Sequence, residues 1–264
     1  MITLAIHPLF AANALQFAFQ KATTEGKFTV GALFILSFFS WTIIITKFRQ
    51  IWIARGAAKK FFASYASTRD PLDIKRKGSA FAGAPAYQLY IRGADELDYH
   101  LQHNPVTVHG QVRVSAAAFD AVKVTLEESA ATQAMSLEKG MIVLSTAVAG
   151  GPFIGLLGTV WGVMDTFAGI ARANSATLTA MAPGVAGALI ATVVGLLVAI
   201  PAMFAYNFMV TSIRAITQEL DGFSTRYATQ IEHTYVDNRD IEDKIAGALR
   251  RAGQAPEPAT IAAP

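Results

Sequence analysis

The chain has 264 residues, of which 53% are hydrophobic and only 16% are charged, whereas about 25% of residues are charged in ordinary soluble domains. The apolar residues gather in long runs and the mean hydropathy is +0.37, so the composition indicates a membrane protein. The chain contains no cysteine, which excludes a disulfide framework, a thiolate metal site and a thiol nucleophile. The net charge of +3 does not indicate nucleic-acid binding, because the basic residues flank the hydrophobic runs.

The first apolar run follows an N-terminal segment, residues 1–27. No basic residue precedes Lys21 and His7-Pro8 interrupts the apolar stretch, which disfavours a cleaved signal peptide. We therefore expect an external segment with a short helix lying against the membrane. Residues 28–46 carry no charge, and as a helix they would cover about 28 Å, the thickness of the hydrocarbon core. They form the first predicted transmembrane helix.

A large polar region follows at residues 47–139, which we expect to be cytoplasmic. Apolar residues at helical spacing continue the first helix to Tyr65, and turn signals then predict short helices and loops over 69–105. After this region, mostly apolar residues recur at alternating steps of four and three, as in a coiled-coil seam. The residues of this seam are Val108, Val112, Ser115, Phe119, Val122, Leu126 and Ser129. Nothing breaks a helix between Gln111 and Lys139, so we predict one long helix that runs without interruption into the next span.

Two further spans are predicted in the second half of the chain. Residues 140–166 form the second transmembrane helix, and the polar residues 167–182 form an external loop. The third transmembrane helix, 183–210, is expected to start near Pro183, because proline is favoured in a first helical turn. Three buried helices of a soluble protein are the alternative, but such helices usually carry a polar stripe.

The C-terminal part of the chain is predicted to be a cytoplasmic helix, 211–251, followed by a disordered tail, 252–264, that is rich in Ala and Pro. One stripe of this helix is apolar. Its residues are Ile213, Ile216, Leu220, Phe223, Tyr227 and Ile231. The stripe and the long helix before the second span predict a cytoplasmic helical bundle.

The basic residues give the orientation. Of the 22 Lys and Arg residues, 13 lie within 47–139 and six lie from Arg214 onward, against three elsewhere. Because positive charge stays in the cytoplasm, we expect the N-terminus outside and the C-terminus in the cytoplasm. The fold class is therefore an all-α membrane protein with three transmembrane helices, two of them extended into a cytoplasmic helical bundle.

Small residues recur at steps of three or four along the second and third spans. They allow helix backbones to approach closely in lipid. The glycines expected to pack in this way are Gly155, Gly158, Gly162, Gly184, Gly187 and Gly195. Three prolines are expected to start or kink helices. They are Pro152, Pro183 and Pro201.

Each small-residue face also carries a hydroxyl group, Thr159 in the second span and Thr192 in the third, and neither span has an ionisable group in its middle. One interpretation is that both hydroxyls bond to carbonyls of their own helix. The other is a polar pair that faces a shared lumen. Asp165, at the external end of the second span, is either a polar group at a pore mouth or a solvated helix-end residue.

Other kinds of chemistry have weak support. His100 and His103 share a helix face, but nothing adds a convincing further ligand, so we expect a surface pair and no metal site. No Ser/His/Asp arrangement stands out, and the region 69–105 shows no catalytic constellation. We expect the chain not to be an enzyme and to need no cofactor.

Two stretches carry a family resemblance. Residues 151–164 (GPFIGLLGTVWGVM) and 181–202 (MAPGVAGALIATVVGLLVAIPA), with Tyr206-Asn207, resemble the signature of the MotA/TolQ/ExbB proton-channel family, in its TolQ/ExbB branch. The resemblance implies a multi-pass protein of the bacterial inner membrane that assembles as a pentameric ring in contact with lipid. It also implies that Thr159 and Thr192 line the path of protons, the transported ion.

The same resemblance implies partners. A TolR/ExbD-like single-span protein would supply an intramembrane aspartate, and a TonB-like or TolA-like envelope-spanning protein would receive the work of proton flow. One position departs from the family, because Gly187 stands where TolQ and ExbB usually carry a glutamate. Two alternatives remain, a membrane scaffold that conducts nothing and a flagellar-stator-like subunit, although the stator relative has four spans.

Overall fold

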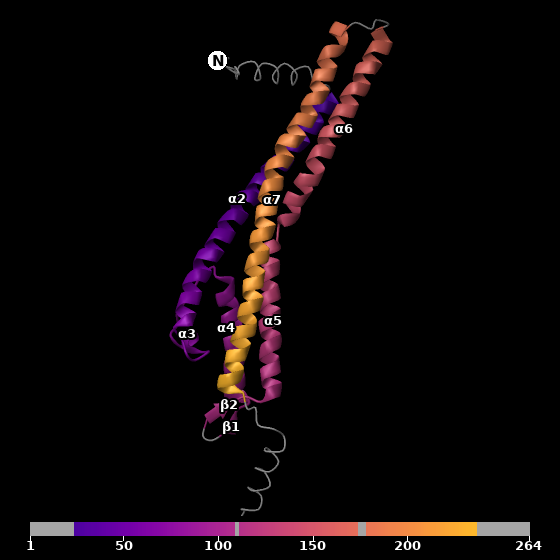
Figure 1. Cartoon of the computed structure of the whole chain (residues 1–264). Coiled ribbons are helices and arrows are strands. Elements are labelled where there is room, and N and C mark those ends of the chain that lie inside the picture. Colours follow the sequence, from indigo (N-terminus) through magenta and orange to yellow (C-terminus); the bar gives the residue numbers. More distant parts are fainter. Residues whose placement is uncertain (1–23, 109–110, 174–177, 237–264) are drawn as a thin grey trace, which may run out of the picture. The chain divides into compact units, whose positions relative to one another are not determined.

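The computed structural model describes residues 24–108, 111–173 and 178–236, and the regular secondary structure of these residues is helical apart from one small hairpin (Figure 1). The helices are α2 (Thr24–Ala66), α3 (Asp73–Arg76), α4 (Pro85–His103), α5 (Ala116–Glu138), α6 (Met141–Ala173) and α7 (Leu178–Tyr235). The hairpin pairs β1 (Val106–Val108) with β2 (Gln111–Arg113). The predicted all-α class is confirmed. The predictions for residues 1–23 and 237–264 lie outside the described residues.

Three of these helices are long and apolar enough to cross a membrane. They are α2, the stretch Met141–Arg172 of α6 and the stretch Gly184–Tyr235 of α7, so the three predicted spans are confirmed by length and composition. The described residues group into two compact units. The span unit contains residues up to Lys59 and Thr132–Glu219, and the bundle unit contains Lys60–Ala131 and residues from Leu220 onward.

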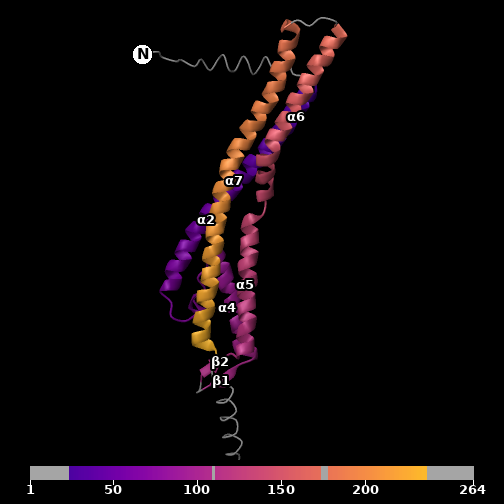
Figure 2. The ribbon, with the colours of Figure 1, turned by 45° about the vertical axis from the view of Figure 1, so that its right-hand side comes forward.

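Within the span unit, α6 and the first part of α7 run side by side, as both views show (Figures 1 and 2). Large apolar side chains remain exposed on both helices, among them Phe153 at 71% and Phe204 at 68%. Exposed apolar surface of this extent marks contact with lipid or with other chains. The span unit is therefore built to be covered on its outside.

The bundle unit has an aromatic core. Phe61, Tyr90, Phe223 and Tyr227 are each 1% exposed or less. The rings of Phe223 and Tyr227 stack with 5.7 Å between centroids, and Phe61 meets Phe223 edge-on at 5.4 Å. Such ring pairs add about 0.5–1.5 kcal/mol each beyond the area that they bury. The predicted apolar stripe of the C-terminal helix is confirmed, because all six of its residues are buried.

The predicted long helix was wrong at its start. The strands of the hairpin are Val106–Val108 and Gln111–Arg113, and Val112 is 51% exposed. The segment is rich in valine and threonine, whose branched side chains favour strands. Helix α5 begins only after Ser115, whose hydroxyl accepts a hydrogen bond from the Ala118 amide at 3.2 Å, as an N-cap does. From Phe119 onward the seam residues are buried as predicted.

The long helix was also wrong at its end, because it does not run into the second span. Helix α5 ends at Glu138 and α6 begins at Met141, and Gly140 between them has φ of +87°. Glycine commonly ends helices in this left-handed conformation. The buried Lys47 ammonium donates hydrogen bonds to the carbonyls of Ser136 at 3.3 Å and Leu137 at 2.9 Å. It thereby satisfies carbonyls that a helix end leaves without partners.

The predicted loop 167–182 is also shorter than expected. Helix α6 continues to Ala173 and α7 already includes Leu178, so both ends of the predicted loop are helical, and 174–177 lie outside the described residues. Strong helix formers in this stretch explain the extension. Pro183 therefore does not mark the start of a helix. Pro152 and Pro201 also lie inside helices, α6 and α7 respectively.

Candidate functional site

The contact between α6 and α7 has glycine on both sides. A Cβ atom built at Gly155 would lie 2.9 Å from the Ala191 carbonyl oxygen, and one at Gly195 would lie 2.6 Å from the Gly151 carbonyl oxygen. Real Cβ atoms do not come this close to backbone. The two backbones touch here because neither position carries a side chain, which is the packing that small residues permit in lipid.

The other small residues extend this contact along both helices. A Cβ at Gly162 would lie 2.7 Å from the Ala188 Cβ, and one at Gly184 would collide with the Thr166 hydroxyl. A Cβ at Gly158 would lie 2.6 Å from the Ala191 Cβ and 2.7 Å from the Thr29 hydroxyl. Gly187 is buried in α7. Gly158 thus lies where α6 contacts both α7 and α2.

The two threonines meet inside this contact. Their hydroxyls are hydrogen-bonded to each other, and both side chains are half-buried. Two carbonyl oxygens also lie within hydrogen-bond distance of the Thr159 hydroxyl. They are that of Gly155 on its own helix, at 3.2 Å, and that of Ala188 on α7, at 3.4 Å. Thr192 reaches the Gly155 oxygen, also at 3.2 Å. The arrangement joins the two helices through their side chains.

This geometry bears on the two interpretations of the threonines. Thr159 does bond to a carbonyl of its own helix, as Ser and Thr often do, whereas the carbonyl that Thr192 reaches belongs to the other helix. Each hydroxyl has one proton to donate and lone pairs to accept with. When one threonine donates to the other, the second donates to a carbonyl, and lone pairs remain that can accept a bond from a protonated acid.

The stretches of α6 and α7 around the pair carry no charged residue. The sequence has no Asp, Glu, Lys or Arg in 140–164 or in 173–213, and the nearest acid along α6 is Asp165. Its carboxylate is half exposed and lies 3.7 Å from the Arg172 guanidinium. Threonine hydroxyls accept and donate hydrogen bonds but do not ionise near neutral pH.

Two further hydroxyls belong to the same helix contacts and were missed in the sequence. Thr29 of α2 is 2% exposed, lies against Gly158, and donates to the Gly26 carbonyl at 2.8 Å. Thr166 of α6 donates to the Gly162 carbonyl at 2.7 Å. Both lie near the ends of their spans, where a polar residue looks unremarkable. Within the described residues there is no group of three acidic or histidine side chains that could hold a metal.

Comparison with known proteins identifies relatives along most of the chain. "Tol-Pal system protein TolQ" of Haemophilus influenzae is 33% identical over 218 residues, which are 80% of this chain and 90% of the relative. "Biopolymer transport protein ExbB" of Xanthomonas campestris pv. campestris is 31% identical over 79% of this chain and 86% of the relative. The ExbB protein of Pseudomonas putida is 30% identical over 79% of this chain and 60% of its own length.

The family-level match covers the part of the chain that contains the α6–α7 contact. The description "MotA/TolQ/ExbB proton channel family" matches residues 97–222, a range that includes Thr159, Thr192 and all the glycines described above. Together with the TolQ relative, which is aligned over nine-tenths of its own length, this match identifies the chain as a member of the MotA/TolQ/ExbB proton channel family.

Proposed function

We propose that this chain is the ring-forming subunit of a proton-driven motor of the TolQ/ExbB type in the bacterial inner membrane. Copies of α6 and α7, five in the ring, surround a central pore, and Thr159 and Thr192 line the path of the proton. The observation that carries the proposal is the pair of hydroxyls that bond to each other within the close contact between α6 and α7. Polar groups at membrane depth are costly and usually serve function.

The proton carrier in this proposal is an aspartate of a TolR/ExbD-like partner with a single span. A carboxylic acid in a pore of low polarity needs hydrogen-bond partners in both of its protonation states. A threonine hydroxyl accepts from the protonated acid, and it donates to the carboxylate when it gives up its bond to a helix carbonyl. The pair therefore lowers the cost of both states without holding the proton itself, which leaves the proton free to pass on.

The orientation in this proposal follows the basic residues, with the N-terminus outside and the C-terminus in the cytoplasm. Each proton that crosses 100 mV releases about 2.3 kcal/mol. That energy would move the ring against its partner helices and so energise a TonB-like or TolA-like protein that spans the envelope. Because Gly187 provides no carboxylate, Asp165 is the acid of α6 that we assign to the external mouth of the pore, where Arg172 neutralises it.

The test removes both hydroxyls and keeps the shape of the side chains. The chain carrying Thr159→Val and Thr192→Val is combined with a TolR/ExbD-like single-span protein in vesicles that enclose a pH-sensitive dye, and proton influx is driven by a potassium diffusion potential. The matched control is Thr146→Val with Thr211→Val. Those hydroxyls lie on the same two helices and bond to carbonyls of their own helix, at 2.8 and 2.9 Å.

We expect influx to be lost in the first variant and kept in the control, with the same assembly mass for both by native mass spectrometry. Influx at the unmodified rate from the first variant would contradict the assigned path. No influx from the unmodified chain with its partner would favour a scaffold that does not conduct.

A further inference from the structure

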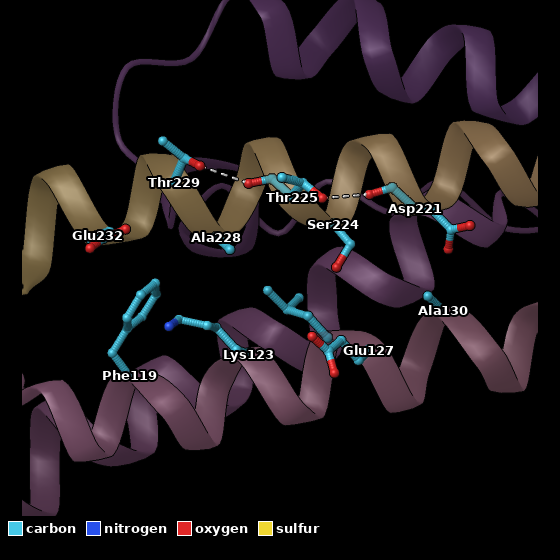
Figure 3. Close-up of a pocket in the computed structure, with 11 residues that line it drawn as sticks. Phe119, Lys123, Glu127, Ala130, Asp221, Ser224, Thr225, Ala228, Thr229 and Glu232 are labelled. Carbon is cyan, nitrogen blue, oxygen red and sulfur yellow. Dashed lines mark hydrogen bonds between the residues drawn. The ribbon is translucent and has the colours of Figure 1, made fainter.

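A groove runs between α5 and α7 in the bundle unit (Figure 3). Its volume is about 400 Å³. The floor consists of small or buried side chains, among them Ala130, Ser224 and Ala228, so a helix can approach it closely. Three carboxylates line it: Glu127 from α5 and Asp221 and Glu232 from α7.

The negative charge of the groove is not balanced within the described part of the chain. Lys123 is the one basic residue in its lining, and its ammonium is engaged by Asp120 at 2.9 Å and by the face of the Phe119 ring at 4.7 Å. None of the three lining carboxylates forms an ion pair with a described residue. Counting Lys123, the lining carries a net charge of −2, from one positive and three negative groups. A groove of this charge suits a cationic side chain.

A second flank of α7 carries a positive charge. Arg226 is the only Lys or Arg between residues 215 and 235, it is exposed, and it forms no ion pair with any described residue. One turn earlier lies Gly222, and a Cβ built there would lie 3.4 Å from an Arg226 guanidinium nitrogen and near nothing else. This flank therefore presents one unpaired positive charge beside a position without a side chain.

The directions of these two faces match a ring. At about 100° per residue, the α7 residues of the groove and the pair of Gly222 and Arg226 point about 110° apart around the helix axis. In a cyclic assembly, the directions from one copy to its two neighbours differ by about 108° for five copies and 90° for four. The buried stripe of Phe223 and Tyr227 then points away from the ring axis, and the exposed Thr225 and Thr229 point toward it.

The two faces also lie at the same level. Both faces are formed by residues from 221–232 of α7. Rotation about a ring axis parallel to this helix therefore brings Arg226 of one copy to the middle of the groove of the next copy. A head-to-tail contact of this kind closes into a ring. Charge complementarity at an interface fixes which partner and which register are accepted.

We propose that the acidic groove between α5 and α7 binds the Gly222 and Arg226 flank of a second copy of this chain. Arg226 then lies among Glu127, Asp221 and Glu232 of its neighbour, and the contact repeats around the ring. The proposal rests on the ring of the proposed function. It adds the surface through which neighbouring copies recognise each other outside the membrane.

Cross-linking tests this contact, and the absence of cysteine from the chain makes the background clean. The chain carrying both Gly222→Cys and Glu127→Cys is treated in membranes with a short bis-maleimide. The matched control carries Gly222→Cys and Glu128→Cys, because Glu128 is exposed on α5 but does not line the groove. We expect a ladder from dimer up to the full ring for the first chain, and a loss of that ladder for the control and for each single cysteine.

A charge reversal tests the role of Arg226 in the same assay. Arg226→Glu should lose the ladder, and adding Asp221→Arg should restore it, whereas Arg92→Glu, at an exposed position on α4, should leave it unchanged. If native mass spectrometry shows a ring but the Gly222 and Glu127 cysteines do not cross-link, the contact is refuted and the proton path is untouched. If the chain is monomeric in membranes, both this inference and the ring are overturned.

Discussion

Replacement of Gly155 by alanine should separate α6 from α7. The new methyl group would lie 2.9 Å from the Ala191 carbonyl oxygen, whereas ordinary contacts begin at 3.4 Å. The two backbones must therefore move apart locally by about 0.5 Å, the difference between these two distances. Overpacking of this kind costs about 1–3 kcal/mol, because neither neighbour is a flexible side chain. The Gly155 carbonyl is also within reach of both threonine hydroxyls, so separation weakens the bonded pair as well.

The assay is thermal unfolding in detergent, followed by helical circular dichroism. At about 2–4 °C for each kcal/mol in a chain of this size, Gly155→Ala should lower the midpoint by roughly 2–12 °C. The control is Gly169→Ala in the same helix, where a Cβ meets nothing within 4 Å. That change should be neutral or stabilise by up to about 1 kcal/mol, as alanine does in helices. Equal midpoints for the two variants would refute the close contact of backbones.

Two further predictions concern polar contacts outside the α6–α7 contact. Lys47→Met should lower the thermal midpoint, because it removes the donor for the last carbonyls of α5, a loss of about 1–3 kcal/mol. Lys60→Met, at an exposed position, should leave the midpoint unchanged. Equal effects of the two changes would argue against capping of α5 by Lys47. Burial acts to raise the pKa of Asp70, but hydrogen bonds from the Leu72 amide and Tyr235 and the charge of Arg76 outweigh it and hold the pKa below its usual range. The folded state is therefore stabilised by this carboxylate above the unfolded pKa of about 3.9, and loses that stability as pH falls through the lower folded pKa. Denaturant titration should show Asp70→Asn less stable than the unmodified chain at neutral pH, with the difference shrinking as the pH falls below the unfolded pKa of about 3.9. A difference that stays constant with pH would contradict the assignment.

Patterns within single helices, namely charge-free runs and the spacing of apolar residues, were the most dependable signals in the sequence. Charge-free runs located the three spans, and the stripe from Ile213 to Ile231 located the buried face of α7. Both patterns depend on the spacing of residues along one helix, which is set by helix geometry alone. From Phe119 onward the spacing of the α5 seam also predicted correctly which residues are buried, because these residues lie within a regular helix.

The errors fell where a second element decides the local structure. Nothing in the run before the second span excludes a helix, yet Gly140 adopts φ of +87° while Lys47, distant in sequence, satisfies the carbonyls of the helix that ends there. Each strand of the β1–β2 hairpin has only three residues, and the pattern of apolar residues around them suits a helical seam equally well. A helix end or a strand pair is stabilised by its partner, and the partner is not visible in a local pattern.

For the site, the residue types could be read in advance, and their relations could not. Spacing singled out Thr159, Thr192 and the glycines around them, because small and hydroxyl side chains stand out in an apolar run. Only the family resemblance predicted that the two threonines line a proton path. Only the packing of α6 on α7 decided that the two hydroxyls bond to each other and that Thr192 reaches a carbonyl of the opposite helix. The order of residues determines what each helix can offer, whereas hydrogen bonds between helices depend on which faces meet and at what register.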